Sequence, residues 1–410
     1  MNTFKITHIF DDDKFIDTAI TLIESVYPGQ SDYLVIKNDN DPFVHVKSTL
    51  VKSVKLFDEN DSKALVAEIL KTGSQAVFFH ALNARKQKIV TLLPKHIVKV
   101  WFVWGFDLYT NWKLFQRFLF EKETYDFIKK GRFLFYFKQK LIFNRFLFAL
   151  FLQSQKTSYF FPKKILAVMQ RNYATQFYAA AKQIDIVVPV IPSEYELIKS
   201  LNINPKFAPF TYGSLEEMLQ DKINVAVRGS MDILVGNSAD PSNNHVDVFK
   251  KLSKFELLDR KVFVPLSYGG NPEYIAFVIA KGKQYLGNNF VPLTNFLTNK
   301  AYNDLLSNCG FLIFNHLRQQ GVGNLIMLGY RGAKIFLHEK SPVFTFYKNL
   351  GMHIYSTQTM SQQMLAAGLT ESQHVDNQKV FYSNYSNVAV KEKIKTLLKT
   401  VQDEITKKQL

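Results

Sequence analysis

The stretch that decides the fold is Ile233–Leu252, which reads ILVGNSADPSNNHVDVFKKL. Its apolar start, Ile233–Val235, predicts a buried strand. The small and polar residues 236–244 predict a loop, and helical spacing begins at His245. A strand, a small polar loop and a helix, in this order, are how an open α/β sheet presents backbone N–H groups to an anionic ligand.

A second stretch of the same kind follows about 80 residues later. Phe311–Phe314 is apolar, residues 315–324 read NHLRQQGVGN, and an apolar helix comes next. Either loop alone is also consistent with an ordinary βα connection that binds nothing. Two such units in one half of the chain indicate a site for a nucleotide diphosphate.

Length and composition predict a globular protein of two domains. The chain has 410 residues, of which 47% are hydrophobic, so there is enough apolar material for two cores. A single cysteine, Cys309, excludes a disulfide framework and fits a reducing compartment. The start lacks the layout of a signal peptide, and no apolar run reaches the roughly 18–20 residues of a membrane span. We therefore expect a cytoplasmic protein.

Strands alternate with helical patterns in both halves, which predicts parallel sheets. We expect domains at 1–220 and 221–385 and a C-terminal helix at 386–410. In the first half the expected strands are 4–10, 33–37, 51–57, 76–80, 98–104, 184–188 and 206–210, and the helices are 14–26, 62–71 and 192–201. In the second half the strands are 233–235, 261–266, 310–314, 333–337 and 352–356, with helices from 245, from 273 and at 298–308.

The net charge of +16 is concentrated in residues 111–164, which hold twelve Lys/Arg against three acids. Phe, Leu and Tyr alternate there with basic residues at helical spacing, a composition that suits the headgroup region of an anionic membrane. A nucleic-acid surface is the rival interpretation, and a helical excursion with solvated charges is the third. The long Phe/Leu runs favour lipid over nucleic acid. The basic residues expected at the membrane are Lys129, Lys130, Arg132, Lys138, Lys140 and Arg145.

Asp-x-Asp pairs hold a divalent cation in some transferases. The sequence contains this pattern at Asp11–Asp13 and at Asp39–Asp41. Both lie far in sequence from the two polar loops, and helix capping explains the first of them. We therefore predict no metal and no cofactor.

Several motifs along most of the chain resemble glycosyltransferase family 56. In the second half they are Leu234-Val235-Gly236-Asn237-Ser238-x-Asp240-x-Ser242-Asn243-x-His245, Pro265-Leu266-Ser267-Tyr268-Gly269 and Arg318-Gln319-Gln320-Gly321-x-Gly323. In the first half they are Phe78-Phe79-His80 and Trp104-Gly105-x-Asp107-Leu108-Tyr109. The basic segment is longer than the family pattern leads one to expect.

The resemblance implies an α/β protein of the GT-B type, with two Rossmann-like domains facing a cleft and a basic aromatic helical insert in the first domain. It also implies transfer of 4-acetamido-4,6-dideoxygalactose (N-acetylfucosamine) from a TDP-sugar to a polyprenyl-diphosphate-linked saccharide, as in enterobacterial common antigen synthesis. The expected location is the cytoplasmic face of the inner membrane, as a peripheral protein.

The donor site is expected on the two polar loops of the second half. Arg318 supplies a forked positive donor, and Gly321 and Gly323 let backbone N–H groups approach the phosphates at a helix start. Negative charge grows on the diphosphate as the sugar leaves, so these donors stabilise the transition state. The full set of expected donor-binding residues is Gly236, Asn237, Ser238, Asp240, Asn243, Tyr268, Arg318, Gln320, Gly321, Gly323 and Asn324, and for Asp240 a capping role is equally open.

Glycosyl transfer also needs a group that accepts the proton of the acceptor hydroxyl. We expect this group at a strand end of the first domain, with Asp107 as the base and His80 as an acceptor-site residue. Asp11 and Asp13, at the end of the first strand, are further candidates, and a structural role is open for each of these residues. Two-domain transferases often bind the ribose of the nucleotide with a carboxylate beyond the phosphate loop. In this sequence Glu339 is a candidate for that role.

Two alternatives remain at this stage. The first is the same chemistry with another nucleotide sugar, in O-antigen or exopolysaccharide assembly. The second is a non-catalytic basic protein that binds nucleotide or nucleic acid. The pairing of polar motifs on both halves favours the enzyme, and the prediction includes no nucleic-acid partner.

Overall fold

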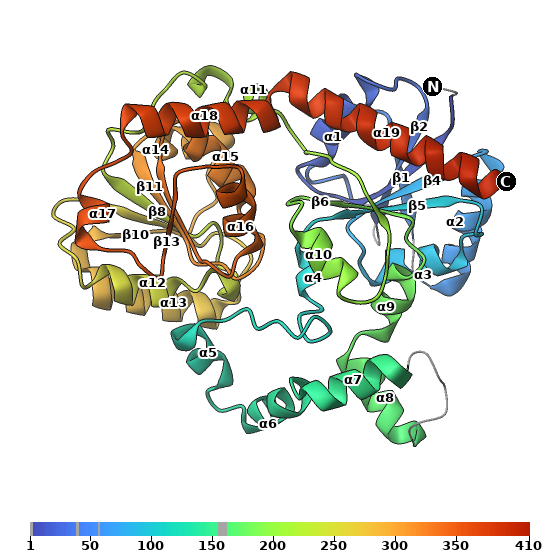
Figure 1. The fold of residues 1–410 in the computed structure, drawn as a ribbon, viewed down its shortest axis with the longest axis horizontal. Helices are drawn as coiled ribbons and strands as arrows, with labels where there is room; N and C mark the ends of the chain where they lie inside the picture. Colours follow the sequence, from blue (N-terminus) through green and yellow to red (C-terminus); the bar gives the residue numbers. More distant parts are fainter. Residues whose placement is uncertain (1–2, 38–40, 56–57, 155–161) are drawn as a thin grey trace. The chain divides into compact units, whose positions relative to one another are not determined.

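The protein forms two compact units, each with its own parallel sheet, in a computed structural model that describes residues 3–37, 41–55, 58–154 and 162–410 (Figure 1). Unit 1 consists of Met1–Arg117, Ile142–Ser214 and Asn387–Leu410. Unit 2 consists of Phe118–Leu141 and Leu215–Ser386. The chain therefore enters unit 2 twice and ends in unit 1.

The sheet of unit 1 has seven strands in the order β3-β2-β1-β4-β5-β6-β7, and all neighbours are parallel. The central strands are buried along almost their whole length, as expected for a sheet covered on both faces. Their bounds are β1 Ile6–Asp11, β2 Ser31–Lys37, β3 Val51–Lys55, β4 Ala76–His80, β5 Val98–Val103, β6 Ile186–Pro189 and β7 Lys206–Phe207.

Helices cover both faces of this sheet (Figure 1). On one face, α1 and the C-terminal helix α19 bury apolar residues such as Leu22, Val390 and Leu397 against Phe78 and Phe102. The helices of unit 1 are α1 Ile16–Glu24, α2 Glu59–Lys71, α3 Ala84–Leu92, α4 Phe106–Tyr109, α7 Arg145–Ser154, α8 Lys163–Asn172, α9 Thr175–Ala181, α10 Glu194–Lys199 and α19 Asn387–Gln409.

The sheet of unit 2 has six parallel strands in the order β10-β9-β8-β11-β12-β13. The strands are β8 Asp232–Val235, β9 Val262–Pro265, β10 Phe290–Leu293, β11 Cys309–Phe314, β12 Lys334–Leu337 and β13 Ile354–Ser356. The helices are α5 Lys122–Lys129, α6 Phe133–Ile142 (which ends at the unit boundary), α11 Leu215–Leu219, α12 His245–Leu252, α13 Pro272–Leu286, α14 Asn299–Leu306, α15 Val322–Tyr330, α16 Pro342–Asn349, α17 Gln362–Ala366 and α18 Glu371–Tyr385.

The core of unit 2 explains why α12 and α15 lie on opposite faces of its sheet (Figure 1). Ile233 and Val235 of β8 point to the face where Val246 and Phe249 of α12 pack. Leu234 alternates to the other face, because successive side chains of a strand point in opposite directions. The two polar loops thus connect neighbouring strands to helices on different sides.

The expected fold class, two parallel α/β domains, is confirmed. The structure adds β10, which the sequence did not predict, and starts or ends most other elements within a few residues of expectation. The end of the expected strand 51–57 lies outside the described residues. The contact-based division places 118–141 and 215–220, expected in the first domain, in unit 2, and it places the C-terminal helix in unit 1.

The expected capping of α1 by Asp11–Asp13 is confirmed only for Asp13, whose Oδ1 accepts from the N–H of Phe15, the residue before the helix, while Phe15 itself makes no side-chain cap. Asp12 instead accepts hydrogen bonds from the backbone N–H groups of Val44, His45 and Val46. These bonds lower the pKa of Asp12 below its ordinary value against the opposing effect of its partial burial. This aspartate therefore organises a loop rather than a helix.

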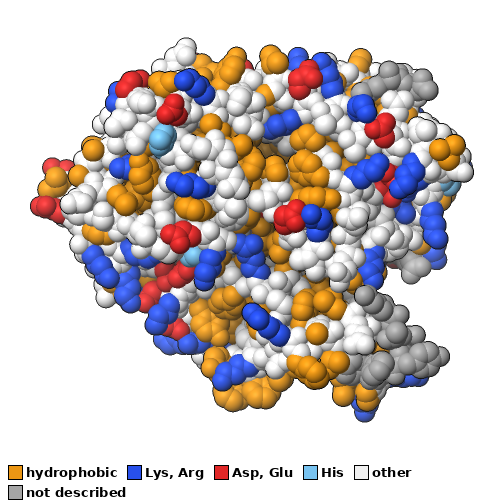
Figure 2. Space-filling model, in the orientation of Figure 1, with side chains coloured by type: hydrophobic (Ala, Val, Ile, Leu, Met, Phe, Trp, Pro, Cys, Tyr) orange, Lys and Arg blue, Asp and Glu red, His pale blue; other side chains and the backbone are white. Residues whose placement is uncertain are grey.

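The basic aromatic segment folds into short helices, α5 to α8, except for residues 155–161, which lie outside the described residues. α6 exposes Phe133 (78%), Leu134 (69%) and Phe137 (54%), and α7 exposes Phe146 (70%). Lys130, Arg132, Lys138, Lys140 and Arg145 are exposed as well, and Figure 2 shows apolar and basic side chains gathered on this part of the surface. Within the described ranges, none of the helices is both long and apolar enough to span a bilayer.

Candidate functional site

The two polar loops of unit 2 leave the sheet side by side. Loop 236–244 follows β8 and loop 315–321 follows β11, and these strands are neighbours. The chain order reverses between them, since β8 continues to β9 on one side and β11 to β12 on the other. In open α/β sheets ligands bind beyond the carboxyl ends of the strands at such a switch point. The topology therefore marks these loops as the candidate site.

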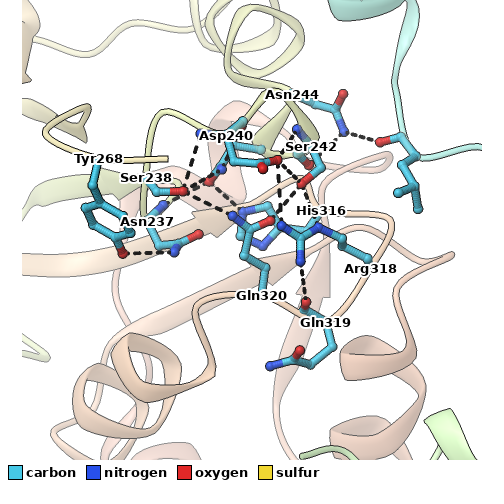
Figure 3. A network of polar contacts seen from close by, with 12 residues as sticks. Asn237, Ser238, Asp240, Ser242, Asn244, Tyr268, His316, Arg318, Gln319 and Gln320 are labelled. Atoms are coloured by element: carbon cyan, nitrogen blue, oxygen red, sulfur yellow. Dashed lines mark hydrogen bonds and ion pairs between the residues drawn. The ribbon is translucent and has the colours of Figure 1, made fainter. Parts of the chain in front are cut away.

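Arg318 is held at this site by a chain of hydrogen bonds across both loops (Figure 3). Its Nε donates to Ser242 Oγ at 2.8 Å, and its terminal nitrogen lies 3.6 Å from Asp240 Oδ1. Gln320 completes the link, with Oε1 2.8 Å from Ser242 Oγ and Nε2 donating to Ser238 Oγ at 3.1 Å. Arg318 is thus pre-oriented before any ligand binds.

Asp240 has the capping role that the sequence left open. Its carboxylate accepts a hydrogen bond from the Ser242 backbone N–H at 2.8 Å, at the start of a short 3-10 helix over residues 241–243. Because it also approaches Arg318, it neutralises part of the guanidinium charge. The contacts support a structural role for this carboxylate.

Gly236 and Asn243 shape the first loop. Gly236 has a φ of +70°, and a Cβ there would lie 2.7 Å from Asn243 Oδ1 and 2.9 Å from His245 Nε2. Asn243 Oδ1 accepts from the Asn237 N–H at 2.9 Å and from His316 Nε2 at 2.8 Å. Burial, with nearby positive charge, holds the pKa of His316 well below its usual value. His316 therefore stays neutral and donates through Nε2.

The N-terminus of α15 has no side-chain cap. It begins after Gly321, whose φ is +66°, and no acidic residue occupies its first turn. Four backbone N–H groups at a helix start lack intrahelical partners and attract anions. A Cβ on Gly321 would lie 2.9 Å from Phe314, whereas a Cβ on Gly323 would meet nothing within 4 Å. Gly323 is therefore not required for packing, and it leaves open space over the first turn.

Four buried polar atoms on these loops and the adjoining turn of α12 lack a hydrogen-bond partner among the described residues. Native proteins rarely leave buried polar atoms unpaired, so such atoms indicate a bound ligand or water. They are Asn237 Oδ1, His245 Nε2, Asn315 Nδ2 and Gln319 Oε1. Their residues are each less than a tenth exposed.

The other expected donor residues lie at the same place. Tyr268 is 46% exposed, and its hydroxyl accepts from Asn237 Nδ2 at 3.3 Å. Asn324, in the first turn of α15, donates to the Tyr302 hydroxyl at 2.8 Å. Asn244, His316 and Asn315 were not selected as site residues from the sequence. Asn244, the last residue of the first loop, has a positive φ, which asparagine adopts more readily than most residues.

Asp107 is buried in unit 1 and fully occupied by hydrogen bonds. Its Oδ2 accepts from the Leu82 N–H at 2.7 Å and from Trp101 Nε1 at 2.6 Å. Its Oδ1 accepts from the N–H groups of Trp104 and Leu108. Burial raises the pKa of this carboxyl despite the bonds. The contacts favour a structural role that ties two strand-end loops together, over the expected role as base.

His80 is also buried and lies in a stack of rings, with centroids 3.9 Å from Phe10 and 4.3 Å from Phe102. Its Nδ1 is 2.6 Å from the Tyr212 hydroxyl and its Nε2 is 3.1 Å from His8 Nδ1. Burial, followed by the nearby charges, holds its pKa well below the usual value. Both nitrogens are thus engaged in the core, which favours a structural role over acceptor contact.

Two aspartates remain at the end of β1. Asp11 Oδ2 is 2.6 Å from Nζ of the buried Lys86, and it also accepts from Asn83 Nδ2 at 2.8 Å. Among the described residues, the Asp13 carboxylate accepts one hydrogen bond, from the Phe15 N–H at 3.1 Å, and burial raises its pKa above the ordinary value. Of the carboxylates at this edge, Asp13 has the environment of a proton acceptor. No group of three or more metal-binding side chains occurs among the described residues.

Residues 209–400 match the family model described as 4-alpha-L-fucosyltransferase glycosyl transferase group 56. This part of the chain is therefore similar to glycosyltransferase family 56. It covers the whole of loops 236–244 and 315–321, so the family 56 pattern includes the site described above.

Solved structures share the fold of the chain. The N-terminal domain of a Candida albicans trehalose-6-phosphate phosphatase aligns with a TM-score of 0.61 at 9% identity, over 98% of this chain and 97% of that one. A Rickettsia africae glycosyltransferase aligns with a TM-score of 0.56 at 9% identity, over 99% of both chains. A lipopolysaccharide outer core galactosyltransferase aligns with a TM-score of 0.52 at 9% identity, over 99% of this chain and 100% of that one. The GT-B fold is thereby shown.

Proposed function

We propose that this protein transfers 4-acetamido-4,6-dideoxygalactose from a TDP-sugar to a polyprenyl-diphosphate-linked saccharide in cell-surface polysaccharide synthesis. The proposal rests on one observation: Arg318, the uncapped start of α15 and buried polar atoms that have no partner among the described residues lie together at one switch point. The family match over 209–400 supports glycosyl transfer as the reaction. The donor and acceptor come from the family resemblance.

The unit 2 site is suited to bind and stabilise a diphosphate. In the proposed reaction the bond between the sugar carbon and the diphosphate breaks, and the electron pair leaves with the diphosphate. Arg318 and the N–H groups at residues 321–324 then face more negative charge than in the bound substrate, which lowers the barrier. Because these groups are already oriented, little reorganisation accompanies the reaction.

The acceptor hydroxyl loses its proton as it attacks the sugar. We assign this proton to Asp13 in place of Asp107, since Asp107 already accepts four hydrogen bonds whereas Asp13 accepts one. A raised pKa makes a carboxylate a stronger proton acceptor than an exposed one. Asp13 is therefore the proposed general base.

A membrane-bound acceptor calls for contact with a membrane surface. The exposed apolar stripe of α6 and the flanking cations fit the headgroup region of an anionic bilayer, as proposed from the sequence. Lys129 contributes less than the other cations, because its Nζ is paired with Asp126 Oδ1 at 2.5 Å. We propose peripheral attachment at the cytoplasmic face of the inner membrane.

The donor and acceptor are tested together with a panel of TDP-, UDP- and GDP-sugars and a synthetic polyprenyl-diphosphate disaccharide. The expected result is transfer from TDP-4-acetamido-4,6-dideoxygalactose alone. Transfer only from another nucleotide sugar would instead support the O-antigen or exopolysaccharide alternative. Stabilisation by oligonucleotides but not by TDP, measured by thermal shift, would contradict the enzyme.

The membrane proposal is tested with vesicles of anionic and of neutral lipid. Replacing Lys130, Arg132, Lys138, Lys140 and Arg145 by Gln should move the protein from the vesicle pellet to the supernatant at physiological salt. The matched control replaces five exposed lysines outside α5 to α8, namely Lys254, Lys379, Lys395, Lys399 and Lys407, by Gln. An equal response of both variants would contradict a specific role for α6 and α7.

A further inference from the structure

Residues 118–129, which we call the strap, belong to unit 2 although its main part begins only at Leu215. The N–H groups of Glu123 and Thr124 at the start of α5 donate to the carboxylate of Asp247 on α12. Farther along, the ring of Phe127 stacks on Phe277, with centroids 4.2 Å apart and an interplanar angle of 16°. The strap is therefore a built part of the donor-binding unit.

Asn244 connects the strap to both donor loops. Its Oδ1 accepts from the Glu121 N–H at 2.8 Å. Its Nδ2 contacts three backbone carbonyls, those of Leu119 in the strap, Ser242 in the first loop and Asn315 in the second. Figure 3 shows the Asn244 side chain directed away from Arg318 toward the strap. Asn244 therefore links the backbone of Glu121 directly to the two loops that hold Arg318.

The side chain of Glu121 is held in one orientation by His338, at the carboxyl end of β12. His338 Nδ1 accepts the N–H of Lys340 at 3.0 Å, so the ring proton lies on Nε2. This Nε2 donates to Glu121 Oε1 at 2.7 Å. His338 is almost fully buried, whereas Glu121 is about one-third exposed. A buried histidine therefore aims a partly exposed carboxylate.

The second carboxylate oxygen, Oε2, contacts no donor in the described part of the chain. The bond from His338 lowers the pKa of Glu121, and Lys251 and Lys340 act in the same direction. The group is thus an ionised acceptor with one oxygen still available. Glu339, the carboxylate expected from the sequence to face the pentose, is exposed, and the structure brings Glu121 to the end of β12 instead.

We propose that Glu121 is a donor-binding residue whose Oε2 accepts a hydrogen bond from a hydroxyl group of the nucleotide sugar. The hydroxyl belongs to the pentose or to the hexose, and both present the same chemistry to a carboxylate. The inference rests on the proposed function, because it requires a nucleotide sugar in the loops of unit 2. An acidic residue that binds a sugar hydroxyl next to a diphosphate loop is a recurring arrangement in nucleotide-binding α/β folds.

The test measures dissociation constants of TDP, 3′-deoxy-TDP and TDP-4-acetamido-4,6-dideoxygalactose for the full chain and for Glu121→Gln. If the pentose is the partner, the substitution weakens TDP about 10-fold and leaves 3′-deoxy-TDP unchanged, since a hydrogen bond to a charged group is lost. If the hexose is the partner, the TDP-sugar weakens about 10-fold and TDP is unchanged. Glu121→Asp, which keeps the charge but shortens the side chain, should give the same pattern if the Gln variant folds poorly.

Glu123→Gln is the matched control, because Glu123 lies in the same strap but pairs with Lys250 at 2.6 Å. It should leave all three constants unchanged. Equal weakening of all three ligands by Glu121→Gln, or no change in any, would overturn the inference and show that Glu121 only fastens the strap. Failure of the unmodified protein to bind any of the three would overturn the proposed function as well, so the two failures are distinguishable.

Discussion

Loop 236–244 of unit 2 and the loop around Asp107 in unit 1 both follow the carboxyl end of a parallel strand, β8 and β5 respectively, but differ in how their polar atoms are satisfied. Asp107 accepts four hydrogen bonds, and both nitrogens of His80 have partners. In unit 2, Asn237 and Gln319 each retain a buried atom without a partner among the described residues. A position at the end of a strand is therefore not enough to identify a ligand-binding residue. A polar side chain there can bind a ligand only if the folded protein leaves one of its donors or acceptors without a partner.

The largest effect is expected at Arg318. Replacing it by Ala should lower kcat/KM by about 1000-fold, because the charge that develops on the leaving diphosphate loses its main positive partner. The melting temperature should change little, since the guanidinium is bound chiefly to side chains of the loops. Steady-state kinetics and calorimetry on the same preparation check both statements. If Arg318→Ala had unchanged kinetics, the loops of unit 2 would no longer differ from the Asp107 region in being the ligand-binding part of the molecule.

Asp107→Asn should affect stability before activity. An amide keeps one acceptor oxygen and turns an NH2 group toward two N–H donors, which should cost about 3 kcal/mol of unfolding free energy. Urea unfolding measures this loss, and the activity per folded molecule should stay near that of the unmodified protein. A 100-fold loss of kcat at unchanged stability would instead restore Asp107 as the base.

Asp13→Asn should lower kcat by about 100-fold, because a general base contributes that much to proton transfer. In the unmodified protein the rate should fall as pH decreases through the pKa of Asp13, since only the ionised form accepts a proton. Burial raises that pKa, so the inflection is expected above 3.8, the ordinary value of an aspartate.

The raised pKa also means that ionised Asp13 disfavours folding, so the contribution of this group to stability falls as pH rises through the same window. Asp13→Asn should therefore melt no lower than the unmodified protein at neutral pH.

The smallest effects are expected from alanine substitutions at two glycines of unit 2, Gly236 and Gly323. Gly236→Ala should cost about 2 kcal/mol of stability, because its φ is +70° and the new methyl group would collide with Asn243 and His245. Gly323→Ala meets open space within a helix and should raise stability by up to about 1 kcal/mol. It should nevertheless weaken TDP binding severalfold by covering the helix start. Thermal melts and titrations separate the effects, and a Gly323→Ala variant with normal TDP affinity would place the diphosphate elsewhere.

The sequence predicted the sheets and the two polar loops of unit 2 because their signals are local. Apolar runs followed by Gly, Ser and Asn mark β8 and β11 within about 20 residues each. It did not predict the partners of Asp107 or the occupied nitrogens of His80, since these depend on neighbours brought together by folding. The contact between Glu121 and His338 joins residues 217 positions apart, so no local pattern could indicate it. β10 was missed because it is a short edge strand interrupted by Pro292.

The strap also determines how the protein can be divided for experiments. The chain passes between the units at residues 117–118, 141–142, 214–215 and 386–387, so no single cut separates them. A fragment of residues 215–386 would keep the six-stranded sheet but expose the ring face of Phe277 and leave the carboxylate of Asp247 without the N–H groups of α5. A fragment meant to represent unit 2 should therefore include residues 118–141 as well as 215–386.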